Sequence, residues 1–208
     1  ETGAVVIDPS YEEMVIVPNS KKDVFLCTYD VNYETGEYST KALNSKNEEI
    51  FTQYDQIEAI GVVDNNEQAS YVENLLKVQK DGKYGLINLD GTELQTCQYD
   101  AITSLQGITN VVKVQKDGKY GLINSEGKEI VSTQYADIYP LAQDNSSNFV
   151  VVNDEGKYGV VSNNNQVILA TNYEQVKDVY SNNYFVVQKD GKEILAKKDG
   201  TEVALNGL

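Results

Sequence analysis

Carboxylates and tyrosines are the residue types of this chain that could do chemistry, because its 208 residues include 32 Asp or Glu and 15 Tyr but no His and no Trp. The lack of imidazole excludes Ser-His-Asp and Cys-His catalysis and His-ligated zinc or iron. Glu93, Glu129 and Glu202 recur at one position of a repeated motif. A glycosidase needs two carboxylates at a defined separation, whereas a repeated outward position is typical of a solvated surface. We therefore expect no catalytic residues.

Two acidic stretches offer oxygen ligands, at 64–67 (Asp-Asn-Asn-Glu) and 144–148 (Asp-Asn-Ser-Ser-Asn). Neither has the alternating spacing of an EF-hand loop. We interpret both as solvated loops and expect no metal and no cofactor. Cys27 and Cys97 are the only cysteines. Cys27 is expected to be a small buried hydrophobe, and whether it is bonded to Cys97 stays open.

The charge of the chain restricts its partners. The formal net charge is −15, which repels phosphate backbones and anionic lipid, and no apolar run approaches the about 20 residues of a membrane span. We expect no nucleic acid and no direct membrane insertion. Residues 1–3 (Glu-Thr-Gly) are interpreted as an expression remnant left after a secretion signal is cleaved. The chain is therefore expected to be an extracellular or cell-surface fragment of a larger protein.

Internal repeats indicate which elements position these residues. The stretch KVQKDGKYGLIN at 77–88 returns unchanged at 113–124, as VVNDEGKYGVVS at 151–162 and as VVQKDGKEILAK at 186–197, with spacings of 36, 38 and 35 residues. Period-two alternation predicts a strand, and its inward pairs are Leu76/Val78, Val112/Val114, Val150/Val152 and Phe185/Val187. The Asp-Gly that usually follows is the preferred type I′ hairpin turn.

A third and a fourth strand complete each unit. A second, Gly-bearing turn precedes an acidic-apolar pair, and a Tyr-x-x-aliphatic segment such as Tyr99 to Ile102 follows it. Four strands in about 36 residues leave almost no room for a helix, so the sequence predicts an all-β fold.

The motif Lys-Tyr-Gly-Leu-Ile-Asn, then Gly-x-Glu-aliphatic, then Gln-Tyr-Asp-x-Ile resembles the WG-type (KWG) β-repeat of bacterial tandem repeat proteins. The resemblance covers residues 75–105, 111–141 and 149–179 well. It departs from the family where tyrosine replaces the usual tryptophan and where the last copy has Glu193-Ile194 instead of an aromatic-Gly pair. The resemblance implies a repeat scaffold from a bacterium and no catalytic residues.

The number of strands indicates whether the repeated units could close into a ring. We expect one β-repeat domain over 4–208 with five four-stranded units, near 18–60, 74–105, 110–141, 148–179 and 183–208, the last completed by 4–17. Pairing of Tyr11–Val17 with the last unit would close a β-propeller-like ring and remove exposed sheet edges. The alternative is an open β-solenoid array.

The repeated aromatic-Gly pairs are expected to be structural: Tyr84 and Gly85, Tyr120 and Gly121, Tyr158 and Gly159. The same residues at the same place in three units are what packing between units requires. Glycine inside a strand often marks a close approach, and we expect the neighbouring unit's aromatic ring to be what approaches.

Variable loops on a rigid scaffold often carry recognition. The loops before each repeated hairpin are acidic and the hairpin turns are rich in lysine, which predicts two oppositely charged ends. We expect a non-catalytic binding module that uses the acidic end to recognise a protein partner, and its carboxylates are expected to steer a basic one. A lectin-like or glycan-active propeller is the alternative. The expected contact residues are Tyr71, Tyr139 and Tyr180 with Asp64, Glu67, Asp144 and Asp178.

Overall fold

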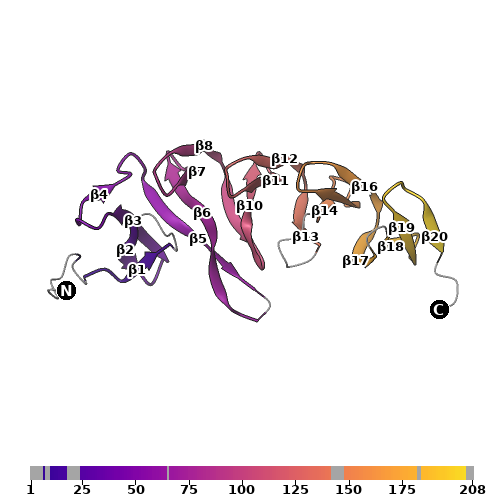
Figure 1. Cartoon of the computed structure of the whole chain (residues 1–208), viewed down its shortest axis with the longest axis horizontal. Coiled ribbons are helices and arrows are strands. Elements are labelled where there is room, and N and C mark those ends of the chain that lie inside the picture. Colours follow the sequence, from indigo (N-terminus) through magenta and orange to yellow (C-terminus); the bar gives the residue numbers. More distant parts are fainter. Residues whose placement is uncertain are drawn as a thin grey trace.

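The structure is a computed structural model that describes residues 7, 10–17, 24–64, 66–141, 148–181 and 184–204. These residues form five antiparallel four-stranded sheets and no helix. The sheets follow one another along an arc, with the first and the fifth sheet at its opposite ends (Figure 1). The expectation of an all-β fold with five four-stranded units is confirmed.

Each sheet consists of four strands that are consecutive in the sequence. The first two sheets comprise β1 (Glu13–Ile16), β2 (Phe25–Asn32), β3 (Glu37–Leu43), β4 (Glu49–Ile50), β5 (Gln56–Val63), β6 (Ala69–Lys80), β7 (Lys83–Asn88) and β8 (Glu93–Tyr99). The third and fourth comprise β9 (Ala101–Leu105), β10 (Ile108–Lys116), β11 (Lys119–Asn124), β12 (Glu129–Tyr135), β13 (Asp137–Pro140), β14 (Asn148–Val152), β15 (Tyr158–Ser162) and β16 (Val167–Tyr173). The fifth comprises β17 (Gln175–Ser181), β18 (Tyr184–Lys189), β19 (Lys192–Lys197) and β20 (Glu202–Ala204).

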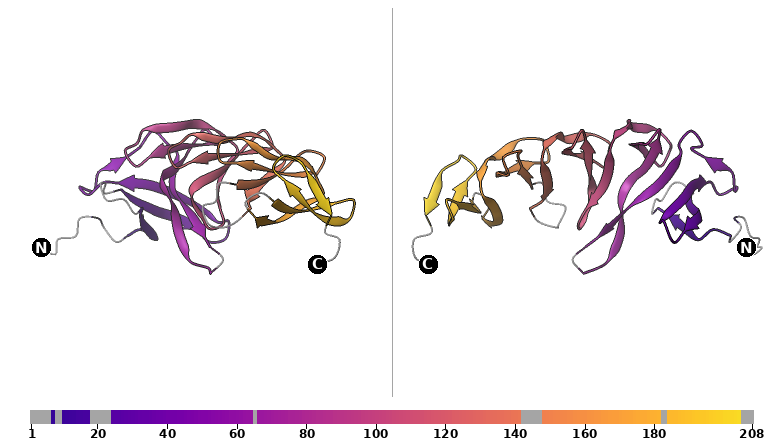
Figure 2. Two further views of the ribbon diagram at one scale, coloured as in Figure 1. Left: turned by 45° about the vertical axis from the view of Figure 1, so that its right-hand side comes forward. Right: turned by 180° about the vertical axis from the view of Figure 1, so that it is seen from behind.

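The sheets begin one strand earlier than the sequence motif indicates. The Tyr-x-x-aliphatic segment, expected to be a single strand, is divided between two sheets: Tyr99 ends β8, and Ile102 lies in β9 of the next sheet. The strand after the tyrosine therefore opens a new sheet and pairs with the strand that follows it. Along the arc, first strands such as β13 and β17 lie on the concave side and fourth strands such as β8 and β12 on the convex side (Figures 1 and 2).

The expected pairing of Tyr11–Val17 with the last unit is wrong. β1 pairs with β2 in the first sheet, with Met14 opposite Cys27. This hairpin joins strands that are near in sequence, so it closes a short loop, whereas pairing with the last unit would close nearly the whole chain. Every strand of the described residues belongs to one of the five sheets, and none of their pairings closes a ring.

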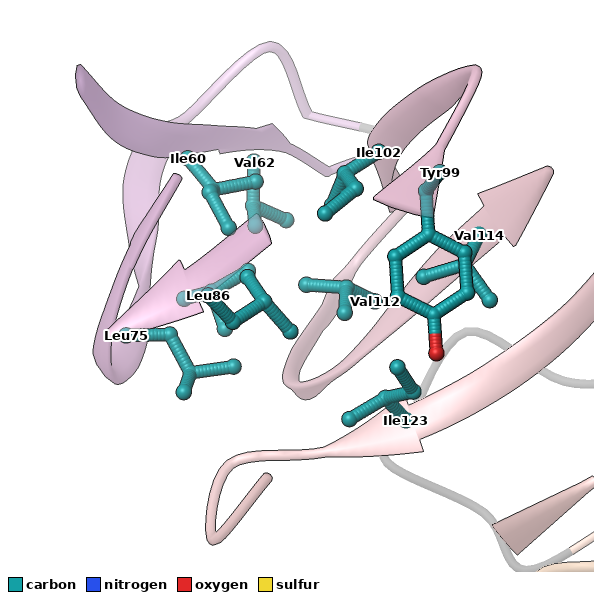
Figure 3. Close-up of a cluster of buried hydrophobic side chains, with 10 residues drawn as sticks. Ile60, Val62, Leu75, Leu86, Tyr99, Ile102, Val112, Val114 and Ile123 are labelled. Carbon is teal, nitrogen blue, oxygen red and sulfur yellow. The ribbon is translucent and has the colours of Figure 1, made fainter. Parts of the chain in front are cut away.

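Four hydrophobic clusters hold the five sheets together, one between each consecutive pair. Figure 3 shows the cluster between the second and third sheets, in which Leu75 and Leu86 meet Val112 and Ile123. Inner sheets are thus buried on both faces. The free energy of unfolding of such a stack is approximately the sum of the stabilities of its units and of the contacts between neighbouring units.

In the fourth sheet the strand faces are opposite to the expected ones. Val150 faces the fifth sheet, whereas Phe149 and Val151 face the third. The cause is a longer hairpin turn: five residues, 153–157, separate Tyr158 from its partner Val152, whereas four, 80–83, separate Tyr84 from Gln79 in the second sheet. In the longer turn the Asn153 side chain accepts the backbone N–H groups of Glu155 and Lys157 at 3.0 and 2.9 Å. One residue of slip moves every side chain to the other face.

The repeated Tyr-Gly pairs lie in the third strand of the sheets. Tyr84, Tyr120 and Tyr158 each pack against the cluster next to their sheet. A Cβ on Gly121 would lie 2.6 Å from the carbonyl oxygen of Val131. The group that approaches is therefore the backbone of the adjacent strand, not the expected aromatic ring, because β12 bulges opposite the glycine.

Candidate functional site

A cleft of about 560 Å³ lies between the first and second sheets. We call it the intersheet cleft. Its charged and aromatic lining residues are Glu12, Glu13, Tyr33, Tyr38, Glu58 and Tyr71. Its remaining walls are formed by small and aliphatic side chains from β1, β2, β3 and β5, among them Leu26, Thr40, Ala59 and Gly61.

The cleft exists because the first sheet lacks the repeated tyrosine. Asn44 turns the chain after β3 as Asn88 does after β7: each side-chain oxygen accepts two backbone N–H groups, at 2.9 Å. Aligning these turns places Thr40 where the second sheet has Tyr84. A ring packs at this point of the next interface, and here a small side chain leaves the space open.

The same alignment shows that a lysine is missing. Lys77 stands opposite Leu86 in the second sheet, and the corresponding pair in the first sheet is Leu26 opposite Ala42. In the second sheet the Lys77 ammonium lies 5.3 Å from the centre of the Tyr84 ring. The first interface therefore lacks both members of the lysine-tyrosine pair.

One wall of the cleft is a two-stranded arm, residues 59–72, that extends β5 and β6 beyond the rest of the second sheet (Figure 1). The arm is thus a β-hairpin. Val62 and Val72 bury one face of the arm against the third sheet, and the Gly107 backbone N–H donates to the Val63 carbonyl oxygen at 3.1 Å. The opposite face, with Gly61 beside Tyr71, lines the cleft.

Polar contacts join the two walls. The Tyr38 hydroxyl donates to Glu58 Oε1 at 2.8 Å, and the buried Thr40 hydroxyl oxygen accepts the Ile57 backbone N–H at 2.8 Å. Lys77 Nζ lies 2.6 Å from Glu58 Oε2. The hydrogen bond to Glu58 is the main cause that raises the pKa of Tyr38 to about 12, followed by burial. Tyr38 therefore stays a protonated donor at neutral pH.

The cleft is negatively charged at its rim. Glu12 and Glu13 are exposed, and no Lys or Arg is among the described residues that line the cleft. Glu58 is matched by Lys77, so the carboxylates of Glu12 and Glu13 carry the negative charge that a ligand would meet. Rings, aliphatic wall and carboxylates together suit a ligand with an apolar stem and a cationic end.

The structure separates the residues expected to form one partner surface. Tyr71 lines the intersheet cleft, whereas Tyr139 packs against the cluster between the fourth and fifth sheets, where burial raises its pKa. Tyr139 therefore contributes to the packing between these two sheets. Asp144 and the side chain of Tyr180 lie outside the described residues.

The three remaining expected contact residues lie in turns or on another sheet. The Asp64 carboxylate accepts the backbone N–H groups of Asn66 and Gln68, which caps the tip of the arm. Glu67 is exposed in that turn with φ of 60°, and Asp178 accepts the N–H of its own neighbour Val179 in the fifth sheet. Tyr38 and Glu58 were missed because neither belongs to a repeated motif.

The lysine-rich hairpin turns are matched by acids. Lys83 pairs with Asp100, Lys119 with Asp154 and Lys189 with Glu202. Three lysines of the predicted basic end are thus paired with carboxylates. The three acids considered for glycoside hydrolysis lie on the fourth strands of three different sheets, and no group of three or more Cys, Asp or Glu that could hold a metal occurs within the described ranges. No helix capable of crossing a membrane is found there either.

Comparisons with known proteins address the repeat. No curated protein matches the sequence. Among solved structures the chain is similar to the crystal structure of BamB from Moraxella catarrhalis, at 12% identity and a TM-score of 0.31, covering 89% of this chain and 56% of that one. This chain thus spans little more than half the length of that structure, and a likeness this low carries no argument. The family model of the WG containing repeat matches residues 84–120, 120–158 and 158–192, more than half of the chain in three consecutive copies. The chain therefore belongs to the WG-repeat family.

Proposed function

We propose that this chain is a non-catalytic extracellular binding module, an open array of sheets that recognises a protein partner at the intersheet cleft. The observation that carries the proposal is the cleft itself. It lies where the first unit departs from the repeat, with Thr40 in place of the tyrosine and with an added arm that supplies Gly61 and Tyr71. Departures that open a cleft beside an anchored arm are what a recognition site on a repeat scaffold requires.

A substitution at Gly61 tests the proposal. A Cβ at this position meets nothing within 4 Å, and Gly61 has no positive φ. Gly61→Trp should therefore fill the cleft without disturbing the strand, and Gly61→Ala is the matched control. The three proteins are immobilised and used to capture surface proteins of bacterial and host cells, and the captured proteins are identified by mass spectrometry.

The expected result is a specific protein retained by the wild type and by Gly61→Ala and lost with Gly61→Trp. Capture of the same proteins by all three would overturn the assignment to the cleft. The same three proteins are applied to a glycan array, because tyrosine rings and carboxylates also suit sugars. Sugar binding that disappears with Gly61→Trp would replace the protein partner by the lectin-like alternative.

A further inference from the structure

We propose that the intersheet cleft takes a lysine or arginine side chain of its partner, with the aliphatic stem against the apolar wall and the cationic end between the tyrosines and the rim carboxylates. This inference rests on the proposed binding function and names the chemistry of that same site. Its test is independent of the partner's identity.

The part of the chain that the structure describes contains this arrangement twice, built from its own residues. Lys77 Nζ lies 5.3 Å from the centre of the Tyr84 ring and 2.6 Å from Glu58. Lys113 Nζ lies 4.3 Å from the centre of the Tyr120 ring and 2.5 Å from Asp137. In each case an ammonium group sits between a tyrosine ring and a carboxylate at an interface or beside it. This geometry is favourable because the ring face and the carboxylate both attract the cation.

The first interface lacks that lysine and the repeated tyrosine, but other tyrosine rings and carboxylates line it. Leu26 stands at the lysine position, so the cleft has an apolar floor where the other two sheets have a cation. Tyr33, Tyr38 and Tyr71 line the cleft, and Glu12 and Glu13 lie at its rim. A partner side chain would supply the missing positive charge. Lysine and arginine fit because they combine a long apolar stem with a charged end.

Net charge supports a cation over an anion or a neutral group. The whole chain carries −15, and Lys77 is already held by Glu58, a residue of the cleft wall. An anionic ligand would meet two carboxylates at the rim without a described basic residue to balance them. A neutral apolar group would form no ion pair with those carboxylates. The partner is therefore expected to present an exposed basic side chain.

The test uses the full chain and two peptide probes that differ only in charge. One is a capped tripeptide Gly-Lys-Gly and the other is the same peptide with norleucine, which has a similar stem and no ammonium group. Binding is followed by chemical-shift changes of backbone amides in amide-labelled protein. Glu12→Gln combined with Glu13→Gln removes two rim charges. Glu126→Gln combined with Glu129→Gln removes two charges on the third sheet and is the matched control.

The lysine peptide should shift the amides of Thr40 and Gly61, and the norleucine peptide should bind roughly tenfold more weakly, the effect of one cation beside aromatic rings. The rim double variant should weaken lysine binding by a factor of roughly three to ten, and the control double variant should not. Gly61→Trp should abolish the shifts at Thr40.

Three outcomes would overturn the inference. If the norleucine peptide binds as tightly as the lysine peptide, the cleft binds an apolar group and the proposed binding function still stands. If Gly61→Trp leaves lysine binding unchanged, the cation binds elsewhere on the acidic surface. If neither peptide shifts any amide of the cleft, the cation is not the recognised group, and the capture experiment alone decides the proposed function.

Discussion

Substitution of Gly121 by alanine tests the reason for the glycine in the repeated Tyr-Gly pair. The added Cβ would lie 2.6 Å from the Val131 carbonyl oxygen and 2.8 Å from the Thr133 nitrogen. Both atoms belong to the backbone of β12, which bulges there: Tyr120 pairs with Tyr135, but Leu122 pairs with Val131. Because a backbone cannot rotate away as a side chain can, the strands must separate or shift.

The size of the effect follows from the crowding. Overpacking of this kind lowers the free energy of unfolding by about 1–3 kcal/mol. Gly61→Ala is the control, since its Cβ meets nothing within 4 Å, and it should raise the free energy of unfolding by about 0.4–1 kcal/mol because the unfolded chain loses freedom. The two effects add to a difference of about 1.4–4 kcal/mol between the variants, which corresponds to about 3–16 °C in melting temperature for a chain of this size.

Thermal unfolding followed by circular dichroism measures this difference. Gly121→Ala should melt below the wild type and Gly61→Ala at or above it. Equal melting temperatures for the two variants would show that the bulged strand yields to a methyl group at no cost. The close backbone approach would then not be the reason for the glycine in the motif.

Three further outcomes follow from protonation and burial. The pKa of Tyr38 is raised to about 12 from 10.0, so its contribution to stability is complete below pH 10 and is lost as the pH rises to about 12. Tyr38→Phe should therefore remove the stability loss between these two pH values. It should also remove one late-titrating phenol from the ultraviolet spectrum. The hydrogen bond from Lys83 lowers the pKa of Asp100 from 3.8. The contribution of Asp100 to stability is therefore complete above about pH 4 and is lost as the pH falls through the lowered pKa. With Asp100→Asn, the urea midpoint of unfolding should fall less steeply as the pH is lowered. Cys27 is fully buried and Cys97 partly buried, both as free thiols. A thiol reagent should therefore modify Cys97 first and Cys27 only at the rate of unfolding. Rapid labelling of Cys27 in the folded protein would contradict its burial.

Local features were predictable because short segments determine them. The Asp-Gly turns at 81–82 and 117–118 have positive φ at both residues, as type I′ hairpins require. Strand faces in the second and third sheets follow from the alternation of apolar residues between these identical turns. In the fourth sheet the same reasoning assigned the wrong face. A turn longer by one residue is a small change in sequence, but it moves every side chain of the strand to the opposite face.

The sequence by itself determined the family, the four-stranded unit and the hairpin turns, since each depends on residues close together in the chain. Tertiary structure alone decided which sheet β1 joins and where a cleft opens. The cleft depends on the absence of a tyrosine ring. The role of Thr40 can be recognised only when its sheet is aligned on the turn at Asn44 and packed against the next sheet. Its walls combine a degenerate first unit with an arm of the second sheet. A space left between two sheets is a property of their packing, and no single segment encodes it.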